Sequence, residues 1–341
     1  MALEAAVVTG APVAWSSNMD DLIRHVATPP THRHLMNAIL LATIPDGANT
    51  VVAMCCAGIV LLLIGLYSAR REIIEARGLD KIVALKSVAI AAPLAVFGAL
   101  HLFGPKFVMP LVPPYMPFRM FWVYGVGVAL IAAALSIATG KAVRWSGVGV
   151  GLTMFGFVAM IHFPGALRHP EMRKLWVICS RELSFGGAGW ILAGVAWGGA
   201  NDRLKGILIM VGRALITIAI VFYGVQHFLH PTLLPGVPLE KEIPTSIPAR
   251  QVIDYVTGVA LLLAGGSVLF SKNTRAVVAA LGAWLLALVL VLYGPLMISA
   301  LFNPAMGEQL VGVNYFADTL LFAGAILALA SVAPRERITL R

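Results

Sequence analysis

The sequence is poor in charged residues and in cysteine. Of its 341 residues only 12% are charged, and its three cysteines form no Cys-x-x-Cys pair. It also lacks a Walker loop, a Cys-x-x-Cys-His motif and a Gly-x-Gly-x-x-Gly fingerprint after a strand, so it gives no support for a nucleotide site or a covalently held haem. No basic run alternates with aromatic residues, and the net charge of +9 therefore does not indicate a nucleic-acid partner.

Apolar residues dominate the chain instead. They make up 59% of it, and the mean hydropathy of +0.88 lies far outside the range of soluble domains. A hydrocarbon core of about 30 Å is crossed by roughly 20 apolar residues in a helix. Runs of that length, or nearly so, lie at 51–68, 82–103, 118–139, 146–163, 183–199, 206–227, 250–270, 276–302 and 314–333. The sequence therefore predicts an all-α integral membrane protein with about nine transmembrane helices.

The charge distribution predicts how the chain lies in a plasma (cell inner) membrane. Fifteen of the 25 Lys and Arg residues fall on the face that holds the tight connections and the C-terminus. By the positive-inside rule the C-terminus is cytoplasmic, and residues 1–50 form an extracytoplasmic tail. The tail has no Lys or Arg before Arg24, so it lacks the start of a cleavable signal peptide, and the span at 51–68 is expected to be retained. A short apolar patch at 35–43 is expected to lie at the interface.

One stretch of the sequence recurs. Residues 117–144 align without a gap to 248–275, 131 positions later, with eleven identical residues. A shared Pro, Arg, Tyr and closing Lys-x-x-Arg are the informative matches in so apolar a chain. The alignment predicts a tandem duplication, with four helices in 82–199, four in 206–333 and one extra span before them. Because four is an even number, the two four-helix bundles are expected to be parallel and not inverted.

Motifs in each unit resemble the DoxX family of small four-helix membrane proteins, which is named after a subunit of an archaeal thiosulfate:quinone oxidoreductase. In the first unit they are GALHLFGPKF at a helix end, VPPYMPFR before the next helix, a Lys-x-x-Arg hairpin and GGAGWILAG in the last helix. In the second unit the same order is GVQHFLHPTLLPGVP, IPAR, YVTGVALLLAG and LFAGAILALA. The resemblance covers roughly 84–333. It implies a helical membrane bundle associated with redox or thiol partners, without implying one reaction.

Histidines are one candidate for a site. All eight fall on the predicted outer face, and His101 and His227 end equivalent helices. The first interpretation is that these imidazoles are amphipathic anchors at the membrane interface. The second is a metal, haem or proton-relay site built from His101, His162, His227 and His230. The anchor interpretation is favoured, because no pair has the helical spacing of a preformed zinc site.

Matching spacing in the two units gives the second candidate. Arg119 and Arg250 begin matching helices, and Glu182 and Asp318 are placed at the start of each unit's last helix on the same face. An arginine there is expected either to clamp a carboxylate structurally or to hold an anionic substrate or a quinone carbonyl. Asp254, four residues after Arg250, is a rival partner for that arginine. Tyr124 and Tyr255 follow the arginines by five residues and are candidates for the same pocket or for the aromatic belt.

Three functions remain open at this level. The preferred one is a redox-associated membrane component linked to a quinone or to electron transfer, in which a quinone, haem or metal is the cofactor. The alternative is a non-catalytic partner or assembly factor for another membrane or exported protein. The third is a small-solute or metal permease, which parallel repeats disfavour.

Overall fold

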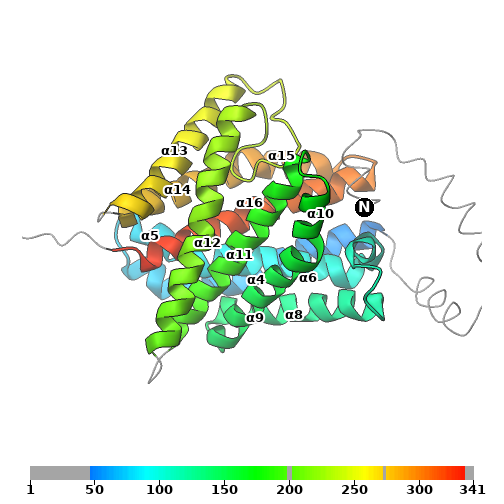
Figure 1. The fold of residues 1–341 in the computed structure, drawn as a ribbon, viewed down its shortest axis with the longest axis horizontal. Coiled ribbons are helices and arrows are strands. Elements are labelled where there is room, and N and C mark those ends of the chain that lie inside the picture. Colours follow the sequence, from blue (N-terminus) through cyan, green and yellow to red (C-terminus); the bar gives the residue numbers. More distant parts are fainter. Residues whose placement is uncertain (1–46, 198–201, 272–273, 335–341) are drawn as a thin grey trace, which may run out of the picture.

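The computed structural model describes residues 47–197, 202–271 and 274–334, and these residues form helices joined by short connections (Figure 1). The predicted patch at 35–43 and nearly all of the predicted tail at 1–50 lie outside the described residues. The first half contains α4 (Gly47–Glu75), α5 (Asp80–Val83), α6 (Lys86–Phe103), α7 (Pro105–Val108), a 3₁₀ turn (Met109–Leu111), α8 (Arg119–Thr139), α9 (Val143–Phe157), α10 (Phe163–Arg168) and α11 (Arg173–Ala196). The second half contains α12 (Asp202–Leu229), α13 (Arg250–Phe270), α14 (Thr274–Leu288), α15 (Gly294–Leu301) and α16 (Met306–Val332).

Glycine and proline set several of these helix ends. Gly140 ends α8 with a φ of 72°, a left-handed conformation that a glycine adopts without steric cost. Gly104 and Pro105 separate α6 from α7, because proline has no N–H with which to continue the helical ladder. The apolar runs between these breaks are rich in Leu, Ala, Val and Ile, and they form the long helices.

Eight of the helical segments are long and apolar enough to cross a membrane, as expected of a multi-pass membrane protein. They are Asn49–Glu75, Asp80–Phe103, Arg119–Thr139, Val143–Arg168, Arg203–Leu229, Arg250–Phe270, Thr274–Leu301 and Met306–Val332. The ninth predicted span, 183–199, falls on α11, which is also long but is not among the eight. Arg173, Lys174, Arg181 and Glu182 lower the hydropathy of α11. Nine apolar spans were predicted, and the described residues contain eight such segments; the ninth predicted span falls on α11.

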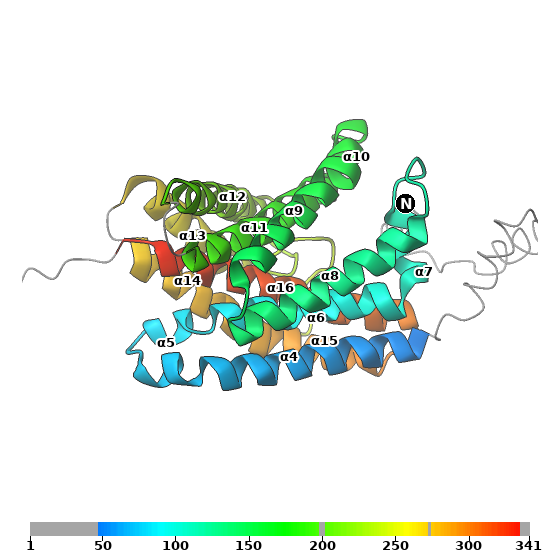
Figure 2. The same ribbon diagram turned by 90° about the horizontal axis from the view of Figure 1, so that it is seen from below.

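Three helices occupy the middle of the molecule. The helices α6, α11 and α16 have mostly buried side chains, and α16 packs against both α6 and α11. Around them, α4 and α8 pack on α6, α9 and α12 pack on α11, and α14 packs on α16. Figure 2 shows α4 running along one side of the molecule, with α5 and the end of α16 near one end and α7 and α10 near the other. The apolar outer surfaces of the peripheral helices remain exposed.

The helix bounds themselves recur along the chain. Helix α13 begins and ends at the positions that align with the two ends of α8, and α14 does the same with respect to α9. Helices α9 and α14 each continue into a π-helical turn, at Val158–His162 and Val289–Tyr293, and the two turns occupy aligned positions. Each π turn is followed within two residues by a proline, Pro164 or Pro295. Proline lacks the N–H that a regular ladder needs, which favours such irregular turns.

Candidate functional site

A buried group of charged side chains joins α11 to α16. The Arg181 guanidinium contacts Asp318 through Nη1 and Oδ2 at 2.9 Å, and its Nη2 lies 2.8 Å from Glu182 Oε1. The three side chains are only 18%, 8% and 5% exposed, for Arg181, Glu182 and Asp318 in that order. We call these three residues the central cluster. Buried charges must be paired to persist, and the arginine provides donors to both carboxylates.

Tyr223 brings a third helix, α12, to the central cluster. Its side chain is fully buried, and its hydroxyl donates a 2.9 Å hydrogen bond to the Val177 carbonyl of α11. Its ring packs edge-on against Phe322 of α16, with centroids 5.2 Å apart. The central cluster therefore lies where α11 and α16, the last helices of the two halves, meet α12.

A second buried polar contact joins α12 to α13. His227 Nδ1 and Asp254 Oδ1 lie 2.5 Å apart, and both side chains are fully buried. The backbone N–H of Gly236 donates to His227 Nε2 at 3.1 Å. Because Nε2 accepts, the ring proton of the neutral imidazole lies on Nδ1 and faces the carboxylate. Neither carboxylate oxygen of Asp254, nor His227 Nδ1, makes a hydrogen bond of regular geometry among the described residues, so the two side chains are held by a close charge contact and not by an aligned hydrogen bond.

The connection between α12 and α13 folds into the bundle over these groups. Its residues 233–239 are buried, and Tyr293 of the second π turn donates to the Pro235 carbonyl at 2.7 Å. Gly236 adopts a φ of 104°, and an added Cβ there would come within 3.2 Å of Thr319, the residue after Asp318. A glycine is therefore required for both its backbone angle and its close approach.

Side chains from α11 and α16 hold this connection in place. Arg173 donates to the carbonyls of Pro238, at 2.6 Å, and Leu239. Lys174 lies 3.3 Å from Glu240, whose backbone N–H donates to the Tyr315 hydroxyl at 3.2 Å. We call residues 230–249 the plug loop, because its buried part packs between α11, α16 and the second π turn.

The predicted arginines begin α8 and α13, as expected, but bond to their own loops. Arg119 donates to the Met109 carbonyl at 2.7 Å. Arg250 donates to the Ile243 carbonyl at 3.1 Å and lies 3.6 Å from Glu242. Their guanidinium groups thus order the connections that precede each helix.

The acidic residues have different partners from those predicted. Glu182 and Asp318 do not start their helices, because α11 begins at Arg173 and α16 at Met306. Both carboxylates pair with Arg181. The rival pairing of Asp254 with Arg250 is also wrong, since Asp254 lies against His227 on the bundle side of α13.

The predicted tyrosines lie apart from the central cluster. Tyr124 is half-buried on α8. Tyr255 is 40% exposed on α13 and packs against Phe228 with ring centroids 5.8 Å apart. The exposure of Tyr255 is typical of an aromatic-belt residue, which was one of the two interpretations of this side chain.

The four predicted histidines have separate environments. His101 Nδ1 donates to the Phe97 carbonyl at 2.7 Å, His162 is buried at the end of the first π turn, and His227 faces Asp254. His230 is exposed in the plug loop, where partial burial and the charge of Arg173 lower its pKa. Within the described residues, no three His, Cys, Asp or Glu side chains are grouped as metal ligands.

Sequence reasoning missed Arg181, Tyr223, Tyr293 and the plug loop. An Arg-Glu pair inside an otherwise apolar helix was the available signal for Arg181, because a charge in such a segment is costly and tends to serve a function. The partner, Asp318, is 137 residues away in the sequence, so the pairing itself had no local signature. The two tyrosines carry no sequence signal that separates them from membrane-interface aromatics.

Comparison with known proteins gives one match. Residues 90–180 match a protein family described as a domain of unknown function (DUF8561). This segment runs from α6 into α11 and ends just before Arg181. Comparison with curated proteins and with solved structures gives no match.

Proposed function

We propose that this chain is a duplicated DoxX-like protein of the plasma membrane that takes part in quinone-linked redox chemistry. In this proposal the central cluster holds and transfers the protons that accompany reduction of the quinone. The supporting observation is the charge count of the central cluster, in which one guanidinium faces two buried carboxylates.

Duplication of a four-helix unit is supported by packing as well as by helix bounds. Where α6 crosses α8, a Cβ on Gly127 would come within 2.9 Å of the His101 Cβ. Where α12 crosses α13, a Cβ on Gly258 would come within 3.0 Å of the His227 Cβ. Gly258 aligns with Gly127 in the repeated stretch, so the same glycine-to-histidine contact recurs in the second half. Close helix approach at small residues is how membrane helices associate.

The charge imbalance implies a bound proton. With both carboxylates ionised, the central cluster would carry one net negative charge inside the membrane. An uncompensated charge at that depth is costly, so one carboxyl is expected to hold a proton that it can exchange. Two acids that share one partner are suited to transfer protons, since one can be neutral while the other is ionised.

Quinone chemistry makes use of such a group. Reduction of a quinone to a quinol takes up two electrons and two protons, and the protons must reach the reacting head group through the bundle. Asp318 and Glu182 would pass the two protons to the head group one at a time, each proton being replaced from water at the end of the bundle. Arg181 would hold the charge of the two acids, and Tyr223 would position α11. A membrane or periplasmic protein with its own redox centre would supply the electrons. A protein partner is therefore part of this proposal too, as the electron donor.

The test is quinone content and the rate at which the quinone is reduced. Protein purified in mild detergent would be extracted and its quinone measured per chain, for the wild type, Asp318→Asn, and Arg168→Gln as a control on an exposed arginine outside the central cluster. We expect about one quinone per chain in all three proteins, and at least tenfold slower reduction of that quinone by dithionite in Asp318→Asn alone, because this variant cannot pass protons to it. Folded wild-type protein without quinone would overturn the redox proposal and leave the non-catalytic partner.

A further inference from the structure

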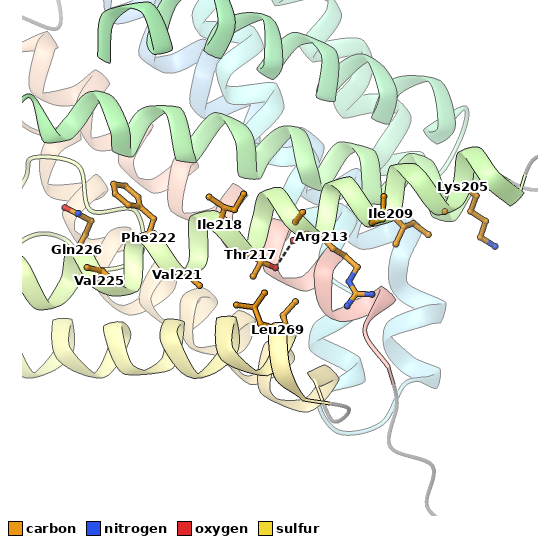
Figure 3. A pocket seen from close by; sticks show the side chains of 14 residues that line it. Lys205, Ile209, Arg213, Thr217, Ile218, Val221, Phe222, Val225, Gln226 and Leu269 are labelled. Atoms are coloured by element: carbon orange, nitrogen blue, oxygen red, sulfur yellow. Dashed lines mark hydrogen bonds between the residues drawn. The ribbon is translucent and has the colours of Figure 1, made fainter. Parts of the chain in front are cut away.

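We infer that a groove along α12 binds an anionic phospholipid from the inner leaflet. The groove has a volume of about 1140 Å³ and lies between one face of α12 and the end of α13 (Figure 3). This volume exceeds the roughly 300–1,000 Å³ of typical small-molecule sites, which suits a long apolar occupant. Its lining includes Ile209, Ile218, Val221 and Leu269.

The lining follows one stripe of α12. Lys205, Ile209 and Arg213 are spaced four residues apart, so they share a helix face, and Thr217 and Val221 continue it. Figure 3 shows the Lys205 and Arg213 side chains on the same side of α12, with Arg213 nearer to Leu269 and Lys205 pointing away from it at the end of the helix. The groove is therefore apolar along most of its length and cationic toward one end.

The two cations have no anionic partner of their own. Arg213 is half-buried and Lys205 is exposed, and neither side chain has a hydrogen-bond or ion-pair partner in the part of the chain that the structure describes. An unpaired arginine eleven residues into a membrane helix is costly. Both side chains are long and flexible, so both can reach one phosphate group from two turns apart. Charge complementarity thus identifies an anionic head group as the occupant of this end.

Position along the helix identifies the leaflet. Lys205 lies near the start of α12, on the face that the positive-inside rule makes cytoplasmic. The lining of the groove extends along α12 from Lys205 to Gln226, which is twenty-one residues or about 32 Å of helix at 1.5 Å per residue. Both cations lie toward its cytoplasmic end, so the head group is placed there and the acyl chains along the apolar remainder. Basic pockets between membrane helices on the cytoplasmic side are known to hold anionic head groups.

Native mass spectrometry of the delipidated full-length protein tests this inference. The probes are phosphatidylglycerol and phosphatidylcholine with identical acyl chains, titrated against the wild type and against Lys205→Gln/Arg213→Gln. We expect the wild type to bind phosphatidylglycerol at least tenfold more tightly than phosphatidylcholine, and the double variant to bind the two lipids equally. The matched control is Lys141→Gln/Arg144→Gln, which removes two exposed cations from the same face outside the groove and is expected to keep the preference.

Two further variants separate charge from shape. Arg213→Lys keeps a cation and is expected to retain most of the preference for phosphatidylglycerol. Ala214→Trp fills the groove at an exposed position without removing charge, and it is expected to weaken binding of both lipids. Equal binding of the two lipids by the wild type, or an unchanged preference in the double variant, would overturn the inference. A dimer that forms on α12 and excludes lipid would also overturn it, by assigning the groove to a second copy. Quinone content does not enter this test.

Discussion

Arg181 stabilises the bundle by preventing two carboxylates from being buried unpaired. Replacing it with methionine keeps much of its volume but leaves Glu182 and Asp318 without their donor. We expect Arg181→Met to lower the free energy of unfolding by about 3–5 kcal/mol, as for other broken buried ion pairs. Unfolding in mixed detergent micelles measures this loss.

The same experiment contains its own check. Adding Glu182→Gln and Asp318→Asn to Arg181→Met removes the unpaired charges, so the triple variant should regain part of the lost stability. Arg168→Met, on an exposed arginine, should have little effect. A triple variant no more stable than Arg181→Met would mean that the arginine acts through packing and not through charge.

His227 and Asp254 offer a comparison with the first half of the chain. The residue that aligns with Asp254 in the first unit is Val123, which is buried at the corresponding place on α8. Asp254→Val removes the acid and leaves the His227 hydrogen bond to Gly236, so we expect a loss of about 1–3 kcal/mol. His227→Leu strands a buried carboxylate and should cost more, about 3–5 kcal/mol. Thermal unfolding of both variants would reveal the order, and the reverse order would contradict the assigned pairing.

At the scale of elements, close backbone contact between α11 and α12 depends on two glycines. A Cβ on Gly187 would come within 2.8 Å of the Gly212 carbonyl oxygen, which cannot move aside as a side chain can. Gly187→Leu should therefore force the helices apart and lower stability by more than about 3 kcal/mol. Gly149→Leu is the matched control, because a Cβ there meets open space on the exposed face of α9. Equal melting temperatures for the two variants would show that α11 and α12 are not held at this distance.

Elements were easier to predict than contacts. The first residue of α8 and of α13 lies within one residue of the predicted span, because a proline-rich loop and a long apolar run mark each boundary. The full extent of α11 was missed, since Arg173, Lys174, Arg181 and Glu182 interrupt its hydropathy. Only packing against α9, α12 and α16 explains how this charged helix is accommodated in the bundle. The plug loop was equally hidden, because its buried residues are held by tertiary hydrogen bonds.

For the whole molecule, the two halves are alike in helix bounds and unlike in polar content. The constant offset between the repeated stretches was visible in the sequence because duplicated segments keep their spacing. The central cluster was not visible in the sequence, because it forms only where the last helix of one half contacts the last helix of the other half. Arg181 comes from the first half and Asp318 from the second. A single four-helix unit would therefore lack this cluster, so the proposed proton site depends on the proposed duplication.

Parallel and inverted halves predict different sides of the membrane for the connections that precede α8 and α13. Tyr115 and Glu242 are exposed in the connections that precede α8 and α13, so both should face outside. Arg77 and Lys141 are exposed in tight connections at the other end and should face the cytoplasm. Single cysteines at these four positions, in a chain whose Cys55, Cys56 and Cys179 are replaced by alanine, can be labelled in intact cells with an impermeant maleimide. Tyr115→Cys and Glu242→Cys should react, whereas Arg77→Cys and Lys141→Cys should react only after lysis. Labelling of Tyr115→Cys without Glu242→Cys would show that the halves are inverted, and would return an alternating-access permease to consideration.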